Sequence, residues 1–148
     1  MNRTWRFHCT QCSRCCRFEE GFVFLTPGDL KGLSRRLVRE EAEVIEKFCR
    51  WVPMGGAVQL SLREKNNRDC IFWTDGGCSV YEARPVQCRT YPFWRHIVDE
   101  EGGWEREAAT CPGIGVGEAW GERKVQALLR ARMRSLPVMR KSPTGEGR

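Results

Sequence analysis

Residues 9–16 read CTQCSRCC, a C-x-x-C-x-x-C-C pattern that places four cysteines within eight positions. Two intervening residues allow a tight turn to bring two sulfurs to one ion, and iron–sulfur clusters use the same short spacing. Cys15 and Cys16 are adjacent, and neighbouring side chains in extended chain point apart. One of this pair is therefore expected to serve a second metal or to bridge two, which predicts a two-metal or cluster arrangement.

A second set of cysteines lies downstream, with 7, 9 and 22 residues between successive members: Cys70, Cys78, Cys88 and Cys111. These intervals alone are not diagnostic of a metal site. Glycine or proline stands near three of the four, and such residues form turns that can aim a sulfur inward. The two sets together supply eight thiols, which is the number that two four-thiolate sites require. The spacing leaves open how the eight divide between sites.

Cys49 is the ninth cysteine of the chain. Together with Ile45 and Phe48 it falls on the apolar face of a helix that the sequence predicts to extend to about residue 50. We therefore expect Cys49 to be a core thiol and not a ligand.

The composition bounds the class of protein. Of the 148 residues, 41% are hydrophobic and 30% charged, which fits one folded domain and argues against disorder. No run of about 18 apolar residues is present, so no membrane span is expected. The N-terminus lacks the apolar core of a secretory signal. This favours a cytoplasmic location, where thiols stay reduced, and an odd cysteine count fits metal binding better than a complete set of disulfides.

Positive charge is concentrated toward the C-terminus. Residues 118–148 hold eight basic and three acidic residues and so carry +5 of the formal +6. Eight thiolates holding two divalent ions would lower the charge of residues 1–117 from +1 to about −3. The basic balance of the whole chain is therefore weak evidence for a nucleic-acid partner.

The fold class that we expect is α+β: a small single domain with irregular metal-organised loops, a few helices and a short β-hairpin. Thr26 to Asp29 has the pattern of a capped helix start, with Pro27 at the first helical position. Residues 22–25 and 57–62 are typical of strands. Residues 93–107 predict a hairpin with its loop around two glycines.

The C-terminal region predicts one more helix, over residues 118–136. Its apolar stripe is Val125, Leu128, Leu129, Met133 and Leu136, and arginines occupy the other face. Residues 1–136 are expected to form the cysteine-cluster metal-binding domain, followed by a flexible C-terminal tail at 137–148.

The segment CIFWTDGGCSVYEARPVQCRTYPF at residues 70–93, combined with CTQCSRCC at 9–16 and Cys-Pro at 111–112, resembles the bacterial YkgJ-like CxxCxxCC cysteine-cluster family of zinc- or iron-chelating domains. The resemblance covers most of the chain. It implies a small cytoplasmic metal-binding module with about eight ligand cysteines: Cys9, Cys12, Cys15, Cys16, Cys70, Cys78, Cys88 and Cys111. Flagellin lysine methylases resemble the same family within longer chains. This sequence has no methyl-donor motif that we identify, so methylation is not carried over.

The metal is either zinc or iron. Closed four-cysteine sites suit zinc, whereas adjacent cysteines and wide, irregular intervals suit an iron–sulfur cluster, which we favour slightly. Arginines near the cysteines (Arg14, Arg17, Arg68, Arg84 and Arg89) could stabilise thiolates or simply lie in solvent. We expect Tyr81, Tyr91, Phe93 and Trp94 to pack a dry shell around the metals.

No residue is assigned a catalytic role. His8 is expected at the surface, His96 has no acidic partner in view, and Asp69 and Asp75 are expected to be solvated in loops. The first functional hypothesis is a protein that binds metal ions for metal handling, electron transfer or sensing. The alternatives are a cluster-dependent enzyme related to the flagellin methylases and a zinc-stabilised module that binds nucleic acid or protein through its basic helix.

Overall fold

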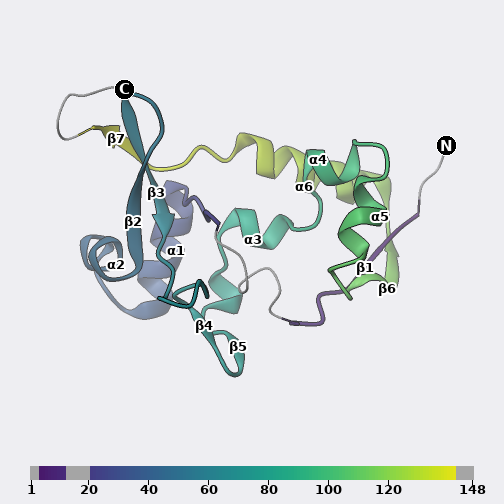
Figure 1. Cartoon of the computed structure of the whole chain (residues 1–148), viewed down its shortest axis with the longest axis horizontal. Helices are drawn as coiled ribbons and strands as arrows, with labels where there is room; N and C mark the ends of the chain where they lie inside the picture. The colour runs from purple at the N-terminus through teal and green to yellow at the C-terminus, as the bar shows by residue number, and fades with distance from the viewer. Residues whose placement is uncertain (1–3, 13–20, 143–148) are drawn as a thin grey trace.

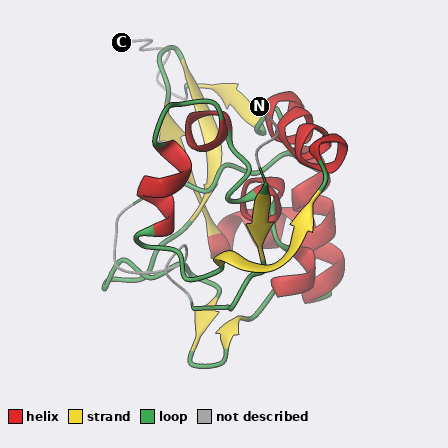
Figure 2. Ribbon diagram, turned by 90° about the vertical axis from the view of Figure 1, so that its right-hand side faces the viewer, coloured by secondary structure: helices red, strands yellow, loops and turns green. Residues whose placement is uncertain are grey.

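The computed structural model describes residues 4–12 and 21–142, and its fold is α+β, as the sequence predicts (Figures 1 and 2). In chain order the elements are β1 (Trp5–Phe7), α1 (Pro27–Leu37), α2 (Glu41–Phe48), β2 (Cys49–Pro53), β3 (Ala57–Leu62), β4 (Trp73–Thr74), β5 (Gly77–Cys78), the 3₁₀ helix η1 (Tyr81–Ala83), α3 (Val86–Thr90), α4 (Arg95–Val98), α5 (Gly103–Ala108), β6 (Ile114–Trp120), α6 (Glu122–Arg134) and β7 (Met139–Lys141).

One half of the molecule is an antiparallel sheet packed against two helices. The strand order is β2-β3-β7, and α1 and α2 lie beside the sheet (Figure 1). The predicted strand at 57–62 is confirmed as β3, and its alternating Val58, Leu60 and Leu62 are buried. Leu33 and Val44 of the two helices are fully buried in the same hydrophobic cluster.

The other half is built around aromatic side chains. β1 pairs antiparallel with β6, and α4, α5 and α6 lie nearby (Figure 1). Trp5 and Trp104 meet edge to face at 4.7 Å between ring centroids, and the Phe93 and Trp120 rings lie 5.0 Å apart at a tilt of 40°. Val125 and Leu129 of α6 are fully buried against this cluster. Offset and edge-on aromatic pairs add about 0.5–1.5 kcal/mol each beyond their burial.

The start of α1 is confirmed in detail. The Thr26 hydroxyl accepts the Asp29 N–H at 3.0 Å, the Asp29 carboxylate accepts the Thr26 N–H at 3.0 Å, and proline stands at the predicted helical position. This reciprocal pair satisfies two N–H groups that a helix start leaves without intrahelical partners.

The hairpin predicted at 93–107 is wrong, because this stretch forms α4 and α5. Ile97 and Val98 are both buried. In a strand, neighbouring side chains point to opposite faces, so on a hairpin with one face in solvent one of these two residues would be exposed. Gly102 adopts the left-handed conformation, with φ +74°, immediately before α5. Short hairpins occur elsewhere, as β2-β3 and β4-β5.

Two boundaries also differ from the prediction. The helix expected to reach about residue 50 ends at Phe48, and Cys49 begins β2 while remaining 2% exposed in the core. Residues 22–25 run alongside β3, and the Leu25 N–H donates to Leu60 O at 3.0 Å. They form an isolated β-bridge at Phe24 and not a full strand.

The C-terminal helix is shorter than expected. Residues 114–120 form β6, so α6 begins at Glu122. Val125 and Leu129 of the predicted stripe face the core, whereas Met133 and Leu136 are 59% and 75% exposed. Residues 139–141, within the expected tail, form β7 and pair with β3. The division into a domain and a tail stays a prediction.

Within the described ranges, no helix combines the length and apolar character that crossing a membrane requires.

Candidate metal centre

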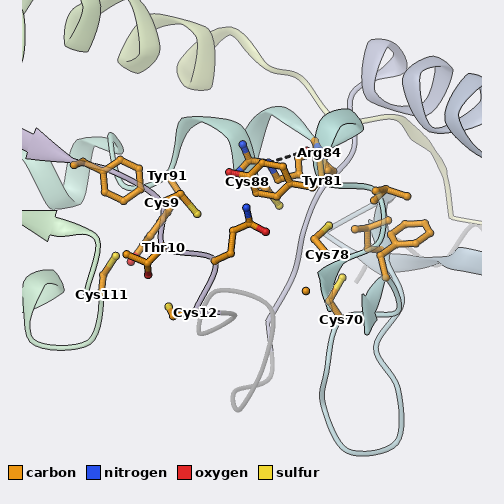
Figure 3. A pocket seen from close by; sticks show the side chains of 17 residues that line it. Cys9, Thr10, Cys12, Cys70, Cys78, Tyr81, Arg84, Cys88, Tyr91 and Cys111 are labelled. Carbon is orange, nitrogen blue, oxygen red and sulfur yellow. Dashed lines mark hydrogen bonds between the residues drawn. The ribbon is translucent and has the colours of Figure 1, made fainter. Parts of the chain in front are cut away.

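A cavity of about 80 Å³ lies between the two halves of the fold, and six cysteines line it (Figure 3). They are Cys9, Cys12, Cys70, Cys78, Cys88 and Cys111. Leu62, Phe72 and Val80 reach the cavity from the side of the sheet, and Phe7 and Tyr91 from the side of the aromatic cluster. Two cysteine sets that are far apart in the sequence therefore meet around one space.

Cys9 and Cys12 reach the cavity from the loop that follows β1. Gln11, between them, adopts a left-handed backbone conformation with φ +55°. Both cysteines line the same cavity. Cys15 and Cys16 lie outside the described residues.

Cys111 is held next to this loop by a close backbone approach. His8 N–H donates to Gly113 O at 3.0 Å, which joins the start of the Cys9 loop to the chain just after Cys111. A Cβ on Gly113 would lie 2.4 Å from His8 O, and one on Gly117 would lie 2.9 Å from the His8 Cβ. Glycine is thus required for β6 to pass this close to the N-terminal segment.

Cys78 lies in the short β4-β5 hairpin, and Cys70 lies in the segment that leads into it. The backbone of Cys70 forms an isolated antiparallel β-bridge with Glu64, and Cys78 is the strand partner of Trp73. Ser79 N–H donates to Phe72 O at 2.8 Å and closes the base of the hairpin. Figure 3 shows the two thiols at the hairpin base, and both line the cavity.

Cys88 lies on α3, which two side chains fasten to the rest of the fold. The buried Asp29 carboxylate accepts the Val86 N–H at 3.0 Å in addition to its contact with Thr26. Gln87 accepts the Phe24 N–H at 3.2 Å and donates to Phe22 O at 2.7 Å. The chain segment that begins just after the first cysteine cluster is therefore attached to the helix that carries Cys88.

Several groups near Cys111 act on its protonation. Burial raises the pKa of the Cys111 thiol, while hydrogen bonds from the Gly113 and Ile114 N–H groups and from the Tyr91 hydroxyl favour the thiolate, and Cys12 disfavours it by charge repulsion. N–H and O–H groups that donate to sulfur are common around metal-bound thiolates.

Tyr91 lies between Cys111 and an acid. Its hydroxyl has one proton, for which Glu107 Oε1 and the Cys111 sulfur are alternative acceptors, and burial, followed by Glu107 and Cys111, raises its pKa. The phenol therefore stays protonated at neutral pH and keeps its donor capacity.

Arg84 supplies positive charge among the described residues around the cavity. Its Nε donates to Tyr81 O at 2.9 Å, and its guanidinium lies 3.8 Å from the Tyr81 ring centroid. Of the other arginines near the cysteines, Arg89 lies 3.8 Å from Asp29 and Arg68 occupies a turn with φ +73°. Arg14 and Arg17 lie outside the described residues.

The donor set suits zinc or iron, because both metals bind thiolates readily. Within residues 4–12 and 21–142, however, no group of three His, Cys, Asp or Glu side chains converges closely enough to hold one ion. The described thiols instead surround a shared space (Figure 3). Cys49 does not line this cavity and lies in the hydrophobic core, which confirms its expected role as a core thiol.

The remaining candidates are not among the residues that line the cavity. His8 and His96 are exposed, and Asp75 is exposed at the tip of β4-β5. Asp69 is 3% exposed and accepts from Asn67 Nδ2 at 3.1 Å, so the expectation of a solvated loop acid is wrong for it. Of the aromatic residues expected around the metals, Tyr81 and Tyr91 line the cavity.

Phe93 and Trp94 belong instead to the aromatic cluster. Their place within the cysteine motif of the sequence predicts a position in the shell, which the structure does not give them. No local pattern marks Gly113 or Gln87, because their roles depend on contacts with residues far along the chain.

Thiols gathered around one cavity are the kind of donor set that zinc and iron take in proteins. The comparison with protein families identifies the particular family: the CxxCxxCC model, described as "Putative zinc- or iron-chelating domain", matches residues 8–112. The chain belongs to this family. No solved structure matches the chain.

Proposed function

We propose that the protein holds a centre of more than one metal atom, with an iron–sulfur cluster as the first candidate, through the thiolates of eight cysteines: Cys9, Cys12, Cys15, Cys16, Cys70, Cys78, Cys88 and Cys111. The observation that carries this proposal is the arrangement of six of these thiols around one cavity. Cys15 and Cys16 complete the set on the evidence of the sequence pattern alone.

The number of thiols argues for more than one metal atom. A closed zinc site takes four ligands, and six thiols already face this cavity. A single zinc ion would leave at least two of them as unligated thiols in largely apolar surroundings. A cluster, or two ions with shared thiolates, uses the whole set.

Zinc is the second candidate, and one feature of the structure favours it. Cys9 and Cys12 form one pair on a tight loop, and Cys70 and Cys78 form another at a hairpin base. Two such pairs are the usual source of ligands for a structural zinc ion.

The role that we propose is metal handling, electron transfer or sensing in the bacterial cytoplasm. The residues around the cavity are thiols, apolar groups, Arg84 and two tyrosines, and we assign none of them a catalytic step. When bound, an iron–sulfur centre would supply reversible one-electron chemistry. The protein residues hold the thiolates in place, limit the access of water and donate hydrogen bonds to sulfur.

A panel of single cysteine-to-alanine variants, prepared without oxygen, tests the proposal. We expect each of the eight substitutions to lower the metal content per chain, because each removes a ligand. Cys49→Ala is the matched control, since it deletes a buried thiol from the core, and it should retain the wild-type metal content. The proposal is contradicted if the cavity variants keep their metal or if the Cys49 variant alone loses it.

A further inference from the structure

Helix α6 carries five basic residues, two of which have partners within the protein. The Lys124 ammonium lies 4.2 Å from the Trp120 ring centroid. The Arg132 guanidinium lies 5.5 Å from the Trp94 ring centroid, and its Nη1 is 3.4 Å from Ser135 Oγ. These two cations therefore interact with aromatic rings of the same chain, and such cation–π contacts stabilise their present positions.

The other three basic residues of α6, Arg123, Arg130 and Arg134, are exposed. Within the described residues, none of them makes a side-chain hydrogen bond, an ion pair or a cation–π contact. At 100° per residue they fall within about 40° of one another around the helix, on the side opposite the buried Val125 and Leu129. They form one line about 16 Å long.

A small residue separates Arg123 from Arg130 along this line. Ala127 is exposed about 20° from the line, and Ala131 is exposed on its flank, so a partner can approach the helix backbone closely. The acid of α6, Glu122, is directed elsewhere: its Oε1 accepts from Gln126 at 2.9 Å and its Oε2 accepts from Trp5 Nε1 at 3.4 Å. The line is therefore purely cationic, and α6 lies along one edge of the molecule (Figure 1).

We propose that this face of α6 binds the phosphodiester backbone of a nucleic acid through Arg123, Arg130 and Arg134, without reading base sequence. Guanidinium groups match phosphate with two parallel hydrogen bonds, and a phosphodiester backbone offers anions at regular intervals. This site is separate from the thiol-lined cavity and does not depend on which metal is bound there.

The composition of the line favours nucleic acid over other anionic partners. A helix that lies on a membrane inserts large apolar side chains, and a protein interface is anchored by apolar or aromatic side chains at its centre. The line holds arginine and alanine. Met133 lies on its flank, where its Sδ is 2.9 Å from Arg95 Nε.

Salt-dependent binding of the full-length, metal-loaded protein to a fluorescent 20-base-pair DNA duplex of random sequence tests this inference. Three phosphate contacts give a slope of about −2.7 for log affinity against log salt, so affinity should fall at least about 40-fold between 50 and 200 mM salt. In the variant R123Q/R130Q/R134Q the slope of log affinity against log salt should be less negative by about 2.7. The single change Arg130→Gln should reduce the slope by about 0.9 if the triple variant folds poorly.

The matched control is K31Q/R35Q/R36Q, which removes the same charge from exposed positions of α1. It should bind the duplex as the wild type does. Equal loss in both triple variants, or absence of binding at 50 mM salt, would overturn the proposal. Binding to anionic phospholipid vesicles or poly-glutamate that depends equally on the α6 arginines would also overturn it, since the partner would then be a membrane or a protein.

Discussion

Gly113 lies against His8 so closely that a Cβ added to it would be 2.4 Å from the His8 carbonyl oxygen, while Gly113 O accepts the His8 N–H at 3.0 Å. Cys9 follows His8, and Cys111 precedes Gly113 by two residues. This backbone contact therefore sets the relative position of two thiols that the sequence separates widely, and both of them line the cavity.

Gly113→Ala should destabilise the fold by about 1–3 kcal/mol, because the backbone must move to relieve the overlap. It should also lower metal retention, since Cys9 and Cys111 move apart. Denaturant unfolding and metal content per chain measure the two effects. Gly32→Ala is the control: it lies inside α1 with no atom near its Cβ position, and alanine there should be neutral or stabilise by about 0.5–1 kcal/mol. Equal stabilities of the two variants would contradict this account.

Asp29→Ala should cost about 2–4 kcal/mol, because the buried carboxylate accepts both the Thr26 and the Val86 N–H groups. Metal content should fall as well, since the Val86 contact fixes the start of the helix that carries Cys88. Asp99→Ala provides the comparison, because its ion pair with Arg95 is half exposed and should contribute about 0.5 kcal/mol at most. An Asp29 variant with wild-type stability would show that the carboxylate does not organise this region.

Cys49 should make stability depend on pH above neutrality. Burial raises the pKa of this thiol to about 12, whereas an unfolded cysteine titrates near 8.5–9. The native state then binds more protons than the unfolded state over this interval, so stability is full below about pH 9 and is lost as pH rises toward 12.

The slope of unfolding free energy against pH tests this dependence. Between pH 9 and 12, stability should fall less steeply in Cys49→Ala than in the wild type, with a difference that grows to a few kcal/mol at most. Tyrosine and lysine titration affects both proteins alike. Parallel curves would indicate that the native thiol titrates normally.

Much of the helix and sheet framework could be predicted from local sequence. The capping residues of α1 and the alternation of β3 are short-range signals, and both are confirmed. The segment at 93–107 could not be read in this way, because its helices depend on burial of Ile97 and Trp104 among distant aromatic rings. Short apolar runs of this kind fit a strand or a helix equally well.

The candidate site also combines features that local sequence predicts with features that depend on distant contacts. The CxxCxxCC spacing and the family resemblance together selected the residues proposed to bind metal, and the apolar helical pattern set Cys49 apart from them. None of these signals could show that Cys9 and Cys111 approach through Gly113, or that Asp29 and Gln87 fasten the helix of Cys88. Those contacts join residues that are far apart in the chain, and no local pattern marks them.

Removal of the metal should disturb the cavity more than the two cores. A structural metal site supplies about 10–16 kcal/mol of apparent binding free energy, comparable to or above the stability of a whole domain of this size. Chelation should therefore change the near-ultraviolet circular dichroism of Tyr81 and Tyr91, which line the cavity, and lower the melting temperature. The far-ultraviolet signal of α1 and α6 should change less, because these helices pack in the hydrophobic clusters. Unchanged spectra and melting would contradict a structural role for the metal.

The most direct test of the central claim is analysis of metal and acid-labile sulfide, with a visible absorption spectrum, on protein purified without oxygen. We predict a brown protein with more than one iron atom per chain and sulfide in a matching amount. A colourless protein with about two zinc ions would replace the iron–sulfur centre by zinc and keep the shared thiol site. A chain that holds one metal ion or none would contradict the claim that these cysteines together form a centre of more than one metal atom.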